Sequence, residues 1–356
     1  MNPLQNIAPA SVMATAAKAQ AAAMKGFHAE FKNLDDYIRV ITHRIWEGRR
    51  LGDIHLYYSD PCVVETAMSV STTLESVITG TRATLAMFPD RRLLAEDVIQ
   101  SGDEDGGFLS SHRIISPMTH SGDGNFGKAT GRKIHARTIA DCVCKDNRIV
   151  HEWLVRDHAA IALQIGSTPQ ALAQDWLNQR GGWNKPVAGS APAGYVSSIS
   201  IDASAQNYAQ TISDFAHGKT STMSIYDEAV QQISPGEVCS YGRVEVEAFW
   251  TGLFAALPVK SFEIEHLAFQ SDIPSTGRPD RVALRFRAKT SHSASHSPHK
   301  ESASRYGKHS DKQVEILGIV HGEFYHGRVI REWVLIDDVA IWMQILDVQL
   351  AHAHAV

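Results

Sequence analysis

The sequence predicts an α+β protein in which one domain occurs twice in tandem. Two observations support this: a repeat at an offset of 180 residues, and helical patterns that precede strand-like ones within each copy. Helices followed by a run of strands are typical of α+β domains, whereas parallel α/β sheets alternate strands with helices. The chain of 356 residues is also about twice as long as a common domain of ~150 residues.

The repeat is clearest near the end of each copy. Segment 148–157 reads RIVHEWLVRD, and segment 328–337 reads RVIREWVLID. The identical pairs are Arg148/Arg328, Glu152/Glu332, Trp153/Trp333 and Asp157/Asp337. Weaker upstream matches pair Arg113 with Arg285, and His120 with His292. A repeat of this length indicates two homologous domains.

The repeat divides the chain into two domains and three connecting or terminal parts. Thr168 and Pro169 predict the start of a short helix that runs through Gln179 and ends at Gly181. The predicted parts are an Ala-rich N-terminal helical arm (1–29), a first domain (30–166), a linker with that helix (167–204), a second, more divergent domain (205–348) and a tail (349–356).

Three helices are expected at the start of the first domain. Segment 34–47 has apolar residues at helical spacing and stops at Gly48. A short helix is expected over 54–58, and a third over 81–88, which Pro89 ends.

Strands are expected from residue 108 onward. Alternating or β-branched runs predict strands over 108–116, 132–144 and 149–157. The short polar segments 145–148 and 326–327 have the composition of hairpin turns. Two Gly- and Ser-containing segments, 121–131 and 291–311, are expected to be loops that join two strands.

The composition excludes several function classes. A formal net charge of -5 argues against a nucleic-acid partner, since such proteins usually carry a basic surplus. No apolar run of about 18 residues is present, so we expect no membrane segment. Four cysteines without zinc spacing favour reduced thiols in the cytoplasm. Dinucleotide- and phosphate-binding motifs are absent, so we expect no cofactor. The histidines of 291–311 are irregularly spaced, and Cys142 and Cys144 have no second cysteine pair nearby, so we expect no metal site.

Several short motifs, read together, resemble those of one family. They are Trp46-x-Gly48, Phe88-Pro89-Asp90, Thr119-His120-x-Gly122, Gly131-Arg132, and Asn147-Arg148-Ile149 leading into Glu152-Trp153 and Asp157. The chain resembles the SnoaL-like polyketide cyclases of the nuclear transport factor 2-like superfamily, in two tandem copies. The resemblance implies two cone-shaped α+β barrels, in which helices pack on a curved, mostly antiparallel sheet around one pocket. It also implies closure of a polyketide ring by intramolecular aldol condensation, with an acid/base Asp and neither metal nor covalent intermediate.

Asp157 is the first candidate for a catalytic residue. Strand alternation places Trp153 and Asp157 on one face, and we expect that face to line the pocket. An indole wall would desolvate the carboxylate and raise its pKa, as an acid/base group requires. Asp157 also stands where the SnoaL-like pattern has its acid/base Asp, and Asp337 is its counterpart. The alternative is that Asp157 caps the helix that follows.

Further candidate residues lie on neighbouring strands of the first domain. His112 and His135 are expected to donate hydrogen bonds to an enolate oxygen, although an exposed strand histidine is the simpler alternative. The second domain has Leu284 and Glu315 at these places, so the first domain is expected to be the active copy. The expected substrate-binding residues are Trp153, Arg113, His120 and Trp333, with maintenance of the fold as the alternative for the arginine and the tryptophans.

The predicted function is that of a cyclase- or isomerase-type enzyme. It would act without a cofactor, by aldol or enolate chemistry, on a small apolar carbonyl compound. The alternatives are a non-catalytic ligand-binding or assembly protein of the same fold, and a hydratase or dehydratase of the same superfamily.

An internal pseudo-dimer is expected, with further homo-oligomers open. The two copies should meet through the outer faces of their sheets. Leu154 and Val334 are expected to be buried between the domains, and Glu152 and Glu332 in or beside the same interface.

Overall fold

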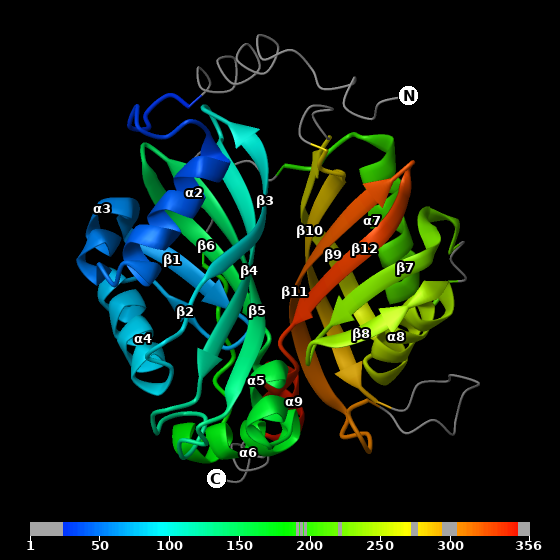
Figure 1. Cartoon of the computed structure of the whole chain (residues 1–356). Coiled ribbons are helices and arrows are strands. Elements are labelled where there is room, and N and C mark those ends of the chain that lie inside the picture. Colours follow the sequence, from blue (N-terminus) through cyan, green and yellow to red (C-terminus); the bar gives the residue numbers. More distant parts are fainter. Residues whose placement is uncertain are drawn as a thin grey trace, which may run out of the picture.

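The computed structural model of the protein describes residues 24–189, 192, 195, 198–219, 223–271, 277–293 and 305–347. It contains two six-stranded sheets, each with helices packed on one face (Figure 1). This arrangement is the α+β class predicted from the sequence, with one unit repeated. The predicted tail and residues 1–23 of the predicted arm lie outside the described residues.

Unit one comprises residues 34–165. Its elements are α2 (Leu34–Thr42), a π-helical turn (His43–Glu47), a 3-10 turn (Leu51–Asp53), α3 (Ile54–Tyr57), β1 (Tyr58–Thr66), β2 (Val70–Ser71), α4 (Leu74–Met87), β3 (Leu94–Asp103), β4 (Gly107–Thr119), β5 (Lys133–Lys145), β6 (Arg148–Arg156) and α5 (His158–Ile165). The strand order is β2-β1-β6-β5-β4-β3. Only β1 and β6 pair in parallel, and β2 and β3 form edges, so the curved sheet is open rather than a closed barrel.

Unit two, residues 203–346, repeats this topology. Its elements are α7 (Ala203–Ala216), a 3-10 turn (Met223–Ile225), β7 (Tyr226–Ser234), β8 (Val238–Tyr241), α8 (Gly242–Ala256), β9 (Val259–Gln270), β10 (Asp280–His292), β11 (Lys312–Tyr325), β12 (Arg328–Ile336) and α9 (Asp338–Leu346). The strand order β8-β7-β12-β11-β10-β9 matches that of unit one strand by strand.

Local sequence signals explain most element boundaries. The Asn33 side chain accepts a hydrogen bond from the backbone of Asp36 and caps α2. Asp146 and Asn147 both have positive φ, as a tight hairpin turn between β5 and β6 requires. Helix α4 begins at Leu74, earlier than predicted, because Thr73 caps it through the backbone of Ser76.

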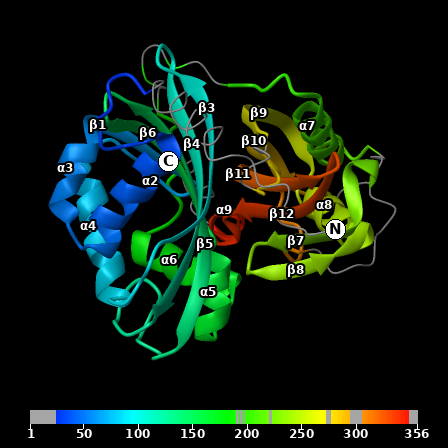
Figure 2. The same cartoon turned by 45° about the horizontal axis from the view of Figure 1, so that its top comes forward.

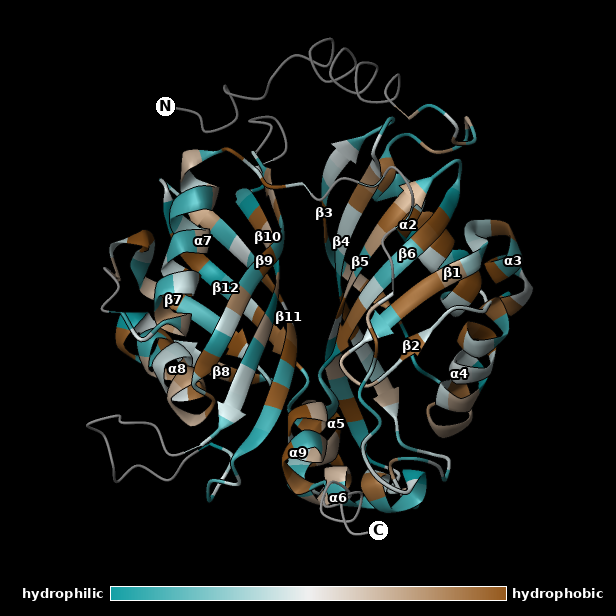
Figure 3. Cartoon of the chain, turned by 180° about the vertical axis from the view of Figure 1, so that it is seen from behind, coloured by the Kyte–Doolittle hydropathy of each residue, from teal (hydrophilic) through white to brown (hydrophobic). Residues whose placement is uncertain are grey.

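The two sheets stand side by side, and their helices cover the far sides (Figure 2). The linker helix α6 (Pro169–Arg180) lies at the foot of the molecule, where it packs against α5 and α9. Trp176 and Leu172 of α6 share a buried apolar cluster with Val339 and Met343 of α9. Figure 3 shows that α5 and α9, next to α6, carry many hydrophobic residues. Helix α6 therefore connects the two units through contacts as well as through the chain.

None of the helices in the described ranges is long and apolar enough to span a membrane.

Candidate functional site

Strand β6 has two faces, and the structure reverses the orientation expected from the sequence. Leu154 belongs to the apolar core of unit one, under its helices, and Glu152 accepts a hydrogen bond there from Tyr58. Trp153 and Val155 point the other way, toward unit two. The expectation that the Trp153 face lines the pocket is therefore wrong.

The same reversal holds in unit two. Val334 lies in the apolar core of that unit, and Glu332 is bound there by Tyr208. Leu154 and Val334 are thus not buried between the units, and neither are Glu152 and Glu332. The sheets do meet through their outer faces, but the residues between them are those of the tryptophan face.

Two arginine–tryptophan contacts cross between the units. The Arg113 guanidinium lies 3.5 Å from the ring centre of Trp333, and that of Arg285 lies 3.7 Å from the ring centre of Trp153. Because both arginines and both tryptophans are buried, these cation–π contacts hold the units together. Arg113, Trp153 and Trp333, expected to bind substrate, are all placed in this interface.

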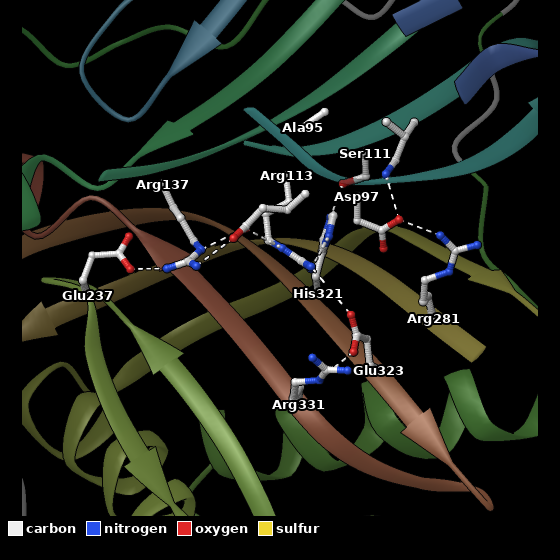
Figure 4. Close-up of polar contacts among 12 residues, drawn as sticks. Ala95, Asp97, Ser111, Arg113, Arg137, Glu237, Arg281, His321, Glu323 and Arg331 are labelled. Carbon is white, nitrogen blue, oxygen red and sulfur yellow. Dashed lines mark hydrogen bonds and ion pairs between the residues drawn. The ribbon is translucent and has the colours of Figure 1, made fainter. Parts of the chain in front are cut away.

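A hydrogen-bonded chain runs through the centre of the interface (Figure 4). Arg113 Nη1 lies 3.2 Å from His321 Nδ1, and His321 Nε2 lies 2.7 Å from Ser111 Oγ. Since arginine can only donate, Nδ1 accepts and Nε2 donates. Ser111 then donates to Asp141, which also accepts from Arg285 at 2.7 Å. Burial lowers the pKa of His321 well below its usual value, so its ring stays neutral.

The two aspartates at the ends of the last strands cap helices beside the interface. Asp157 accepts hydrogen bonds from the backbone of Ala160 in α5 and of Gly236 and Glu237 in unit two. Burial raises its pKa to about 7, and these N–H groups act in the opposite direction. Asp337 caps α9 and lies 2.7 Å from His158 Nδ1 of unit one. Asp157 and Asp337 both cap the helix that follows them, which is the alternative stated from the sequence. Neither carboxylate lies in the interior of its unit.

The remaining histidine candidates are separated from one another. His120 is buried next to the loop between β4 and β5, where its ring contacts Thr130. His135 is exposed, and the side chain of Gln164 bonds its backbone. Only His112 faces the interior of unit one, because it pairs in register with Ala140 of the core.

The interior of unit two holds a buried carboxylate, Glu332, within one continuous apolar cluster. Four donors bind the Glu332 carboxylate: Tyr208 and Tyr226 at Oε1, and Gln232 and Trp250 at Oε2. A single apolar cluster surrounds this group and runs from the helices to both ends of the sheet. A carboxylate held in this way has no acceptor position left for another molecule.

The matching Glu152 of unit one is far less occupied. It accepts one hydrogen bond in the described part of the chain, from Tyr58 at 3.2 Å. Two of the donors to Glu332 have no equivalent in unit one. Val64 pairs with Glu152 where Gln232 pairs with Glu332. Thr81 stands eight residues before Pro89, as Trp250 stands eight residues before Pro258. Tyr37, the counterpart of Tyr208, donates instead to the Asn147 carbonyl. Burial raises the pKa of Glu152.

Further polar groups of unit one face the same interior. Arg156 follows Leu154 on the inner face, at the place that buried Ile336 takes in unit two. Arg91, which follows α4, interacts electrostatically with Arg156. Burial lowers the pKa of His112 to about 3, and its Nε2 has no hydrogen-bond partner in the described chain.

The apolar core of unit one is divided where these groups lie. One cluster contains Tyr58, Ala140 and Leu154, and a second contains Met87 and Ala136. Unit two has one continuous cluster in the corresponding space. We therefore take the interior of unit one as the candidate site, with Glu152, Arg156, Arg91, His112 and Tyr58.

Sequence reasoning had identified only His112 as a candidate among these five. Glu152 was assigned to the interface, and Arg156 was placed on the same strand face without a functional role. The signal that could have found the site is the contrast between copies, since Arg156 and His112 correspond to Ile336 and Leu284. Within the described ranges, no group of three or more His, Cys, Asp or Glu side chains has the geometry to hold a metal ion.

Similar proteins are found among solved structures. IdmH from Streptomyces antibioticus is 23% identical over 37% of this chain and 96% of its own, with a TM-score of 0.32. A SnoaL-like polyketide cyclase from Agrobacterium tumefaciens is 18% identical over 37% of this chain and 96% of its own, at 0.31. TsrD from Streptomyces laurentii is 15% identical over 37% and 92%, at 0.32. No protein-family model and no curated protein sequence matches the chain.

Proposed function

We propose that unit one binds a small carbonyl compound in its interior and moves a proton on it, with Glu152 as the acid/base group. The observation that supports this is the contrast between Glu152 and Glu332. The same buried carboxylate has four donors in unit two and one in unit one. An under-occupied buried carboxylate with a raised pKa is suited to take a proton near neutral pH and to return it.

The neighbouring groups complete this chemistry. Tyr58 donates to Oε2 of Glu152 and leaves Oε1 to accept the α-proton of the substrate. Removal of that proton leaves an enolate, whose negative oxygen the Arg156 guanidinium would stabilise. The His112 ring, neutral at physiological pH, could donate a second hydrogen bond. The enolate can then be reprotonated elsewhere, which is isomerisation, or attack a second carbonyl carbon of the same molecule, which is cyclisation.

Unit two has a supporting role in this proposal. Its interior contains one continuous apolar cluster, and its counterparts of Arg156 and His112 are apolar. An assembly role for unit two, with catalysis in unit one only, combines the two functions that the sequence leaves open.

Proton exchange into D2O tests the proposal without knowledge of the natural substrate. With phenylacetone as the probe, the full chain is expected to accelerate loss of the α-proton NMR signal. Glu152→Gln is expected to lower that rate about 100-fold, because the amide cannot accept the proton. Asp157→Asn is the matched control, since its carboxylate lies outside the interior. Unchanged exchange with Glu152→Gln, or loss confined to Asp157→Asn, would contradict the assignment.

A further inference from the structure

The interior of unit one contains two arginines, Arg156 and Arg91, whose guanidinium groups form no hydrogen bond or ion pair in the described chain. The Nε atom of Arg91 is buried and has no hydrogen-bond partner in the described chain. Glu152 and Asp337 attract Arg156, and Glu47 attracts Arg91, without direct contact. Glu47 is itself bound by Arg92 and the backbone of Leu93.

The two charges are half-buried and act on each other. Burial is the largest influence on both pKa values and lowers that of Arg156. Burial and the charge of Arg156 together lower the pKa of Arg91 to about 10. Arginines are almost never withdrawn from water unless something pairs with them. The paired arginines of the interface, Arg113 and Arg285, show the usual situation in this chain, because each has a carboxylate partner.

We propose that the ligand of unit one is a small organic acid, whose carboxylate binds Arg156 and Arg91 and whose apolar body lies along the two adjoining apolar clusters. The planar fork of a guanidinium matches a carboxylate through two parallel hydrogen bonds. The clusters around Leu154 and around Met87 lie on either side of the polar groups and supply the apolar surface. This inference rests on the proposed function and specifies its substrate class.

Binding of a matched pair of probes tests the inference. 2-Naphthoate and 2-naphthamide share a ring system and differ in charge, so calorimetry on the full chain isolates the contribution of the carboxylate. We expect the acid to bind at least about tenfold more tightly than the amide. Arg156→Ile, which introduces the residue of unit two, is expected to remove that preference, and Arg156→Lys to retain part of it. Arg82→Met is the control, because Arg82 is exposed on α4.

The outcomes separate the inference from the proposed function. Equal binding of acid and amide, or a preference that survives in Arg156→Ile, overturns the anionic ligand and leaves the interior site standing. Absence of binding by both probes overturns the interior site as well.

Urea unfolding gives a second readout that does not depend on the probes. Arg156→Ile is expected to raise the unfolding midpoint of the free protein, since it removes an unpaired charge from the interior. A lowered midpoint would show that Arg156 has a structural partner and would contradict the inference.

Discussion

Glu152 and Glu332 show how one residue can have two roles in the same fold. Both stand at the same position of the last strand and both are buried. Their difference lies in the neighbours: Gln232 and Trp250 complete the shell of Glu332, whereas Val64 stands in strand register with Glu152. The chemistry of a buried carboxylate is therefore determined by how many donors surround it.

Glu332→Gln should destabilise the protein by about 2 kcal/mol or more, because the amide nitrogen would face donors that have no acceptor left. Glu152→Gln should cost less than about 1 kcal/mol at pH 7, where one donor is involved. Urea unfolding of both variants measures the difference. Equal losses would mean that Glu152 has structural partners of the same strength.

The pH dependence of Glu152→Gln has a defined sign. The folded-state pKa of Glu152 lies above its unfolded value, so the stabilising contribution of its protonated form is lost as the pH rises through that folded value. Glutamine does not titrate. The variant should therefore gain stability relative to the unsubstituted protein as the pH rises above the unfolded value of about 4.3, and a constant difference would contradict this.

At the scale of elements, the sequence predicted which segments pair but not which face is inside. Helices α2 and α3 and strands β4, β5 and β6 were predicted close to their observed bounds. Strands β1 and β3 were missed, because acidic residues such as Asp60 and Asp97 interrupt their apolar pattern. Trp153 was expected to line the pocket because strand alternation places it on the face of Asp157. That face instead meets the other unit, where Arg285 packs on the Trp153 ring.

The filled interior of unit two depends on close contact between β10 and β11. The Phe286 ring occupies the space in front of Gly318, where an added Cβ would come within 2.3 Å of ring atoms. Gly318→Ala should lower the free energy of unfolding by about 1–3 kcal/mol, since a buried ring cannot move without displacing its neighbours. Gly52→Ala is the control, because nothing lies within 4 Å of a Cβ there. Equal midpoints for the two variants would show that unit two has free space.

At the scale of the whole molecule, buried histidines should make the protein sensitive to acid. Three buried histidines have lowered pKa values: His112 and His266 near 3, and His321 well below its usual value. A histidine that must stay neutral in the folded state costs about 2 kcal/mol at pH 5 relative to pH 7, if its unfolded pKa is about 6.5. Stability is therefore expected to fall as the pH drops below about 6.5.

His321→Gln tests the interface part of this prediction. His321 is surrounded by Arg113, Arg281 and His112, all of which oppose its protonation. The variant should lose about 2 kcal/mol less than the natural protein between pH 7 and pH 5, measured by urea unfolding at both values. An identical loss would mean that His321 does not contribute.

The crossed Arg113–Trp333 and Arg285–Trp153 contacts have a historical consequence. A single ancestral unit that carried both residue types would have been complementary to a second copy of itself about a two-fold axis. In such a homodimer, any substitution near the axis is inherited by both subunits, so an aspartate there would face another aspartate. Asp141 and His321 occupy equivalent positions in the two units, and Ser111 hydrogen-bonds both. An acidic and a basic side chain thus stand where a homodimer would have two identical residues. Joining two copies in one chain frees the two halves to differ at the axis, and the two interiors differ as well: Ile336 lies in an apolar cluster where the first unit has Arg156.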